Sequence, residues 1–140
     1  VQILPNESLE IERDGERLTI IGIEDPLIGK EPQQMLDEAM ATVDDKSFKI
    51  LLSHRPEIFE TYVENAVDVV FTGHAHGGQI RLPFSDGLFA PGQGWFPSQT
   101  SGVHEADETR MVVSRGLGNS VLQQRLFNLP EIVVVDLKSQ

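Results

Sequence analysis

Three of the four histidines in the sequence lie at positions where they could do chemistry together. His54 directly follows the apolar run 49–53, and His74 and His76 lie in the segment 73–78, Gly-His-Ala-His-Gly-Gly, which follows the β-branched run 67–72. The glycines let the backbone turn sharply and leave no large side chain beside the rings. Because neutral imidazole is the commonest metal ligand, the pattern predicts a metal site. A structural, hydrogen-bonded histidine cluster is the alternative.

A metal held by three imidazoles with one open position can activate water, which would serve hydrolysis or hydration. On the residues alone both reactions stay open. Arg115 lies beside the flexible turn 116–118, where its guanidinium could hold a phosphate oxygen, and its alternative is an ordinary surface cation. The segment 87–97 gathers apolar and aromatic side chains, and we interpret them as part of the domain's own core rather than as a substrate wall or lid.

The chain between the histidines predicts the unit that brings them together. A strand at 49–53, a helix that begins near Pro56 and a strand at 67–72 form a βαβ unit with parallel strands and a right-handed crossover. Ligands of open α/β sheets bind at the carboxyl ends of the strands. Two neighbouring strands would therefore deliver all three imidazoles to one edge of the sheet.

Hydrophobic periodicity and turn residues predict the remaining elements. A hairpin around Asp14-Gly15 and an amphipathic helix that begins at Pro32 precede the βαβ unit. The expected elements are a hairpin at about 8–23, a helix at 32–43, a strand at 79–82, a loop at 83–109, a strand at 110–114, a turn at 115–119 and a final strand at 131–137.

Length and composition limit the classes of function. The 140 residues suit one globular domain, and 22 acidic against 11 basic side chains give a net charge of −11. So acidic a surface repels phosphate backbones and anionic lipids, which excludes a nucleic-acid scaffold as a general partner. The chain has no cysteine, which excludes thiolate metal sites and disulfides. No apolar run is long enough to span a bilayer, so we expect the chain as given to be soluble.

Taken together, these motifs resemble those of the calcineurin-like metallophosphoesterases, and more narrowly the bacterial phosphohydrolase branch similar to YkuE and YaeI. The resemblance covers nearly the whole chain, and its motifs are 52–57 (Leu-Ser-His-Arg-Pro-Glu), 72–84, 114–118 and Pro130-Glu131. It implies an α/β fold, the C-terminal half of a four-layer αββα sandwich with mixed β-sheets. Residues 1–140 would all belong to that C-terminal part of a calcineurin-like phosphoesterase domain.

The resemblance also implies a function, the hydrolysis of phosphate mono- or diesters by a dinuclear centre of divalent transition metals such as Mn, Fe or Zn. It gives His54 and His74 to one metal and His76 to the other, and it suggests that Arg115 contacts the phosphate ester. The family's Asp-x-His, Gly-Asp and Gly-Asn-His motifs are absent from these residues. The metal site is therefore incomplete here, and the family's catalytic histidine is absent from these residues. We expect this chain alone to be inactive or nearly so.

Other interpretations stay open beside the phosphoesterase half. The same fold half could be a non-catalytic binding or assembly module, or a mononuclear tri-histidine enzyme. The start at Val1 fits either removal of an initiator Met or a fragment of a longer protein. A half sandwich would leave sheet edges and apolar faces exposed, so we expect self-association or domain swapping. Relatives of the family suggest that the whole protein is exported or membrane-associated.

Overall fold

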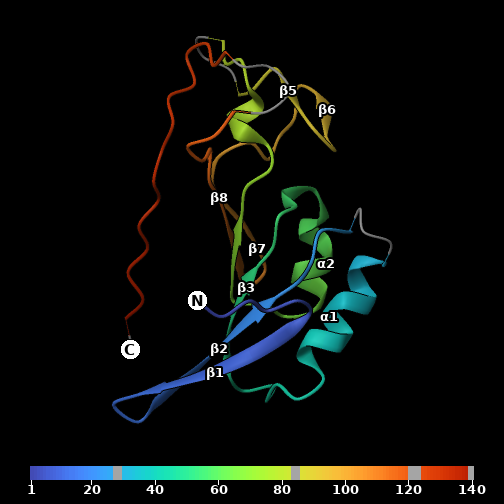
Figure 1. Ribbon diagram of the computed structural model, residues 1–140, viewed down its shortest axis with the longest axis vertical. Helices are drawn as coiled ribbons and strands as arrows, with labels where there is room; N and C mark the ends of the chain where they lie inside the picture. The colour runs from blue at the N-terminus through green and yellow to red at the C-terminus, as the bar shows by residue number, and fades with distance from the viewer. Residues whose placement is uncertain (27–29, 83–85, 120–123, 139–140) are drawn as a thin grey trace.

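The computed structural model describes residues 1–26, 30–82, 86–119 and 124–138, and a six-stranded sheet forms its centre (Figure 1). The sheet has the order β1-β2-β3-β4-β8-β7. Strands β2, β3, β4 and β8 run parallel, and the two edge strands β1 and β7 are antiparallel to their neighbours. The bounds are β1 Glu7–Arg13, β2 Glu16–Gly22, β3 Phe48–Leu52, β4 Val69–Thr72, β7 Gly102–Ala106 and β8 Thr109–Val113.

The N-terminal hairpin forms as predicted. Asp14 and Gly15 both have positive φ, 55° and 84°, which is the backbone of the tight turn that an Asp-Gly pair favours. The turn sets the register, because Arg13 pairs with Glu16 and the pairing continues to Glu7 opposite Gly22. Strand β2 thereby presents Ile21 to the core and continues the sheet to β3.

The predicted βαβ unit is confirmed as well. Strand β3 is followed by the short 3-10 helix η2 (Pro56–Ile58), the helix α2 (Phe59–Glu64) and strand β4. Strands β3 and β4 are parallel neighbours, with Leu51 opposite Val70. Helix α1 (Pro32–Met40) begins at the predicted proline and ends three residues before position 43.

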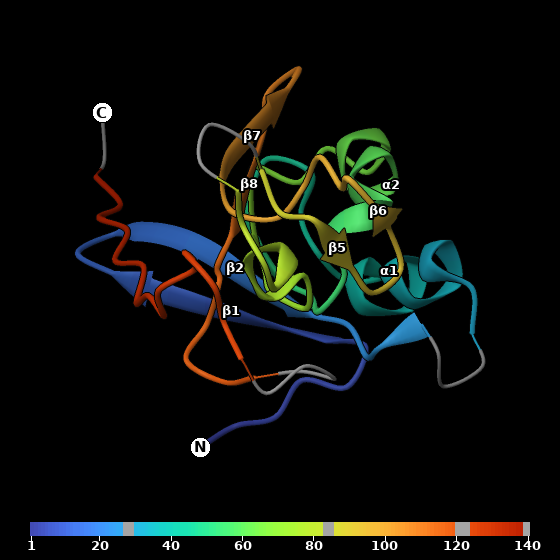
Figure 2. The same ribbon diagram turned by 90° about the horizontal axis from the view of Figure 1, so that it is seen from above.

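Both helices cover the same face of the sheet (Figures 1 and 2). The core lies between them and the strands, because alternate strand residues and one stripe of each helix point into this layer. Its most buried members are Ile21, Met35, Leu36, Leu51, Tyr62, Val70, Met111 and Val113.

The C-terminal segment runs along the opposite side of the sheet from the helices (Figures 1 and 2). The final strand predicted at 131–137 is wrong for the structure: within the described residues this segment pairs with no strand. Ile132 and Val134 are 77% and 81% exposed. Its apolar residues have strand propensity, but a strand also needs a neighbour that offers backbone hydrogen bonds.

Two further predictions differ from the structure. The strand predicted at 79–82 is reduced, among its described neighbours, to isolated bridges of Ile80 with Leu126 and of Arg81 with Gly87. The loop predicted at 83–109 contains β7 and the short pair β5 (Phe89–Ala90) and β6 (Gly94–Trp95). Strand β7 escaped prediction because it is a half-exposed edge strand without apolar alternation.

The mixed α/β architecture agrees with the expected fold class, as part of a metallophosphoesterase-type sandwich. In the described ranges, no helix combines the length and the apolar character that crossing a membrane requires.

Candidate functional site

Two of the predicted histidines meet at the carboxyl ends of β3 and β4. His54 and His74 each follow the end of their strand by two residues, and the backbone N–H of Gly73 donates to the carbonyl of His54 at 3.4 Å. Nδ1 of His74 lies 2.8 Å from Nε2 of His54, and the ring centroids are 4.5 Å apart. The structure thus brings this predicted pair together, as parallel neighbouring strands should.

The buried guanidinium of Arg55 lies at the centre of this site. Its Nε and Nη2 donate to the two carboxylate oxygens of Asp25 at 2.9 and 3.2 Å. Its Nη1 donates to Glu57 Oε1 at 3.1 Å and to His74 Nε2 at 3.0 Å. Only 9% of the Arg55 side chain is exposed, so these partners replace nearly all of its hydration.

The contact with Arg55 defines the protonation of the histidine pair. A guanidinium only donates, so Nε2 of His74 must accept, and a neutral His74 carries its proton on Nδ1. That N–H then donates to Nε2 of His54. Burial first, and then the positive charge of Arg55, lowers the pKa of His74. The ring is therefore held neutral, which is the form that binds metals.

A buried tyrosine of α2 holds the backbone that carries His54. The hydroxyl of Tyr62 donates to the carbonyl of Arg55 at 2.7 Å and accepts from Ser53 Oγ, also at 2.7 Å. Tyr62 is fully buried in the core. The turn that presents His54 and Arg55 is therefore attached to the core on both sides of His54.

The third predicted histidine lies in the turn that follows His74. His76 begins the 3-10 helix η3 (His76–Gly78), in a run of residues with positive φ. Among the described residues, no three His, Asp or Glu side chains are grouped so that they could hold a metal ion. Asp25 approaches His54 Nε2 only to 3.9 Å. A ligand role for His76 stays a prediction.

Arg115 lies beside the His76 turn rather than beside the histidine pair. Its Nε is 3.0 Å from Glu131 Oε2, and its backbone N–H donates to Glu131 Oε1 at 2.9 Å. Its stem covers Gly77, because a Cβ built there would come within 2.8 Å of the Arg115 side-chain carbons. The guanidinium is paired with Glu131, and its role towards a substrate stays a prediction.

The apolar segment 87–97 lies next to the same site. Gly92 approaches Glu57 so closely that a Cβ there would come within 2.2 Å of Glu57 Oε1. Ala90 is buried, but Trp95 and Phe96 are 69% and 76% exposed. Our interpretation of these aromatic residues as part of the core is therefore wrong for Trp95 and Phe96.

Sequence reasoning missed Asp25, Glu57 and Asn128, which all contact the predicted loops. In the sequence, Asp25 indicated only the end of the predicted hairpin, and Glu57 was noted only as the last residue of the motif 52–57. No spacing signals the ion pair of Asp25 with Arg55, because the two residues are 30 positions apart in the chain. Glu57 lies only two residues from Arg55, but such a spacing is too common to indicate an ion pair. Asn128, in the C-terminal segment, donates to the carbonyl of His76.

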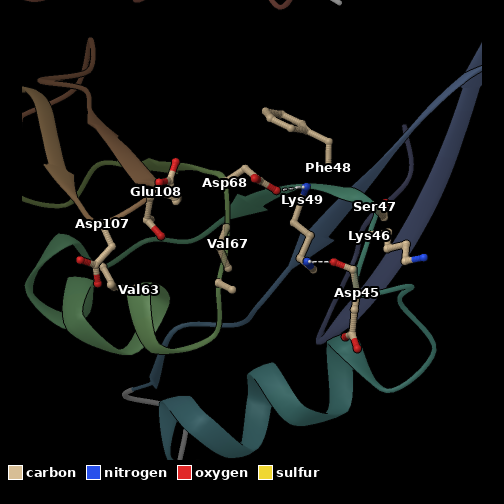
Figure 3. Close-up of a pocket in the computed structure, with 12 residues that line it drawn as sticks. Asp45, Lys46, Ser47, Phe48, Lys49, Val63, Val67, Asp68, Asp107 and Glu108 are labelled. Carbon is tan, nitrogen blue, oxygen red and sulfur yellow. Dashed lines mark hydrogen bonds between the residues drawn. The ribbon is translucent and has the colours of Figure 1, made fainter.

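A second polar region lies at the amino ends of the same strands (Figure 3). The hollow there is lined by charged residues of both signs, among them Asp45, Lys49 and Asp68. Lys49 Nζ donates to the carbonyl of Asp45 at 2.9 Å, and the Lys49 backbone N–H donates to Asp68 Oδ2 at 2.7 Å. These contacts satisfy the backbone where β3 begins.

The histidine pair has a donor set that fits one metal ion in part. Two imidazole nitrogens about 2.1 Å from a tetrahedral metal are about 3.4 Å apart, so the 2.8 Å between His74 Nδ1 and His54 Nε2 would have to widen for both to bind one ion. Binding through either nitrogen of His74 displaces a present partner, which is His54 or Arg55. Two imidazoles alone leave an ordinary coordination shell unfilled.

Comparison with known proteins finds several bacterial relatives. The chain is 33% identical to the uncharacterized metallophosphoesterase YkuE of Bacillus subtilis, over 90% of this chain and 42% of that protein. It is 26% identical to the phosphodiesterase YaeI of Escherichia coli, over 98% of this chain and 47% of that protein. It is also 33% identical to the UDP-2,3-diacylglucosamine pyrophosphatase LpxG of Chlamydia muridarum, over 61% of this chain and 28% of that protein.

The chain spans less than half the length of each of these relatives. No family model matches the chain, and no solved structure matches it significantly. The relatives match most of this chain and include both proteins that the sequence motifs resemble, so the expected resemblance is confirmed.

Proposed function

We propose, from its similarity to YkuE and YaeI over most of its length, that this chain is part of a metal-dependent phosphoesterase. The whole protein would hydrolyse a phosphate mono- or diester at a dinuclear centre of divalent transition metals. This chain would supply three histidine ligands of that centre, His54, His74 and His76. The other ligands would come from outside these 140 residues.

The observation that carries the proposal is the contact between His54 and His74. The two imidazoles, with nitrogens 2.8 Å apart, lie at the carboxyl ends of neighbouring parallel strands, where α/β folds bind ligands. His54 and His74 would hold one metal, and His76 would hold the second. Two metals would neutralise the charge that builds up on the phosphoryl oxygens and supply an activated water.

The chain's own residues would orient this half of the centre. Arg55 holds the His74 ring through Nη1, and Tyr62 holds the backbone on both sides of His54. Contacts of this kind fix ligand orientation in metal sites. Arg115 is the cation of this chain that we assign to the phosphate ester, and it would have to leave Glu131 to reach it. On this proposal the isolated chain has no phosphoesterase activity of its own.

The test is the metal content of the purified chain. After equilibration with Zn²⁺ or Mn²⁺ and dialysis, elemental analysis compares the wild type with a variant in which His54, His74 and His76 are alanine. The control is His104→Ala, because His104 lies on β7, away from the predicted site, and its Nε2 lies 3.2 Å from the carbonyl of Ser101. We expect one metal per wild-type chain, its loss in the triple variant and its retention in His104→Ala. Equal metal content in all three proteins would overturn the proposal.

A non-catalytic binding or assembly module is the second candidate. It is favoured by the hydrogen bond between His54 and His74, which uses the nitrogens that a shared metal would need. On this interpretation the pair is a structural contact supported by Arg55. The same experiment separates the two functions, because the module requires no metal uptake by the wild-type chain.

A further inference from the structure

The turn that carries His76 has an unusual backbone. His76, Gly77, Gly78 and Gln79 have φ values of 47°, 66°, 73° and 56°, and His74 has a φ of 58°. Glycine adopts this left-handed region freely, but residues with side chains disfavour it, so His74, His76 and Gln79 keep this conformation only where neighbouring groups hold them. The turn therefore needs partners outside itself.

Asn128 supplies such a partner at both ends of the turn. Its Nδ2 donates to the carbonyl of His76 at 2.6 Å and to the carbonyl of Gln79 at 3.1 Å. Asn128 is only 1% exposed and lies 52 residues from His76 in the chain. The two carbonyls determine the orientation of the amide, since a flipped group would place its oxygen against both of them.

The space around Asn128 is built for this contact. A Cβ on Gly77 would come within 2.2 Å of Asn128 Oδ1, so a residue other than glycine would push the amide away. Leu126 brings the segment into place, because its carbonyl accepts from the N–H of Arg81 at 3.0 Å. The segment that carries Asn128 is therefore hydrogen-bonded to Arg81, two residues after the turn.

We propose that Asn128 is a positioning residue, which holds the 76–79 turn in its left-handed conformation and thereby sets the orientation of the His76 ring. The inference rests on the proposed function in that His76 is the ligand of the second metal there. If the two hydrogen bonds of Asn128 are lost, the backbone of the turn is free to move, and the His76 ring loses its fixed orientation.

The experiment records the ring nitrogen and carbon signals of the histidines by NMR in the metal-free chain. Asn128→Asp keeps the shape of the side chain but cannot donate when ionised, so it removes both bonds and places a charge against two carbonyls. The matched control is Asn65→Ala, which removes a comparable donor to a helix carbonyl, that of Thr61 at 2.8 Å, in another part of the fold.

We expect the His76 ring signals to shift and broaden in Asn128→Asp, while those of His104 and the His54–His74 pair stay as in the wild type. Asn65→Ala should leave all four rings unchanged. A general loss of stability would not select His76, so this pattern separates positioning from a merely structural role. Unchanged His76 signals in Asn128→Asp would overturn the inference. If that variant does not fold, Asn128→Ser is judged by the same criterion.

A Zn²⁺ titration then separates this inference from the proposed function. If His76 responds to Zn²⁺ in the wild type, Asn128→Asp should require at least tenfold more metal for the same response, and an unchanged requirement would overturn the inference. If no wild-type histidine responds to Zn²⁺, the proposed function fails. The metal-free spectra decide on Asn128 in either case.

Discussion

The two ends of the parallel strands each bury one cation, and they use it in opposite ways. At the carboxyl ends Arg55 binds two carboxylates and an imidazole, which are all side chains from different segments. At the amino ends Lys49 Nζ binds the carbonyl of Asp45, and Asp68 accepts from the Lys49 backbone (Figure 3). The amino end satisfies the backbone, whereas the carboxyl end connects side chains to one another.

This difference indicates which end is suited to chemistry. A side chain that is hydrogen-bonded to a backbone atom can bind a ligand only if that backbone hydrogen bond is broken, which disturbs the fold. Side chains that bind one another can exchange partners with a ligand while the backbone stays in place. The neutral His74, placed between Arg55 and His54, is of this second kind. The predictions below test the contrast between the two ends.

The largest expected effect is at Arg55. Replacing it in Arg55→Met leaves Asp25 and Glu57 close together without their cation, and breaking a buried pair in this way costs about 3–5 kcal/mol. Urea unfolding of the variant and the wild type measures the difference in the free energy of unfolding. A loss below about 1 kcal/mol would show that the carboxyl end tolerates loss of its cation, and the contrast would disappear.

A smaller effect is expected at Tyr62. The substitution Tyr62→Phe keeps the ring in the core but leaves the carbonyl of Arg55 and the hydroxyl of Ser53 without their partner. Unsatisfied buried groups of this kind cost about 1–3 kcal/mol. Thermal unfolding monitored by circular dichroism checks this, and the His54 ring signals should broaden as its backbone loosens. A fall in stability with unchanged His54 signals would contradict the positioning of His54 by Tyr62.

The comparison also explains what the sequence could predict. The hairpin at Asp14-Gly15 and the βαβ unit follow from local patterns, namely turn residues and periodicity, and both are confirmed. The meeting of His54 with His74 follows from them, since both residues come directly after neighbouring parallel strands. These features depend on short stretches of chain and one rule of topology.

The features that could not be predicted depend on distant partners. Asp25 reaches Arg55 from 30 residues away, and no spacing of residue types indicates that contact. The same holds for Asn128 and the His76 turn. The strand predicted at 131–137 fails for the related reason that propensity does not supply a neighbour, and in the described residues that segment pairs with none.

At the amino ends, the substitution Asp68→Ala removes the carboxylate that accepts from the backbone N–H of Lys49 at 2.7 Å. The lost bond involves a charged acceptor, but Asp68 is only half-buried, so water can replace part of it. We expect a loss of about 1 kcal/mol, measured by urea unfolding. The His54 and His74 ring signals should not move, because this contact lies at the other end of the strands. A shift of those signals would connect two ends that the contrast treats as separate.

The smallest effect is expected at Lys49, which is the direct counterpart of Arg55. Lys49 is at least as buried as Arg55, with 6% of the residue exposed against 7%, yet Lys49→Met should cost no more than about 1 kcal/mol. Methionine retains an apolar stem of similar length, and the abandoned carbonyl belongs to Asp45, an exposed residue that water can reach. Burial alone would predict similar losses for the two cations. Unfolding Lys49→Met beside Arg55→Met in one urea series measures the difference, and equal losses would show that burial, rather than the kind of partner, decides the cost.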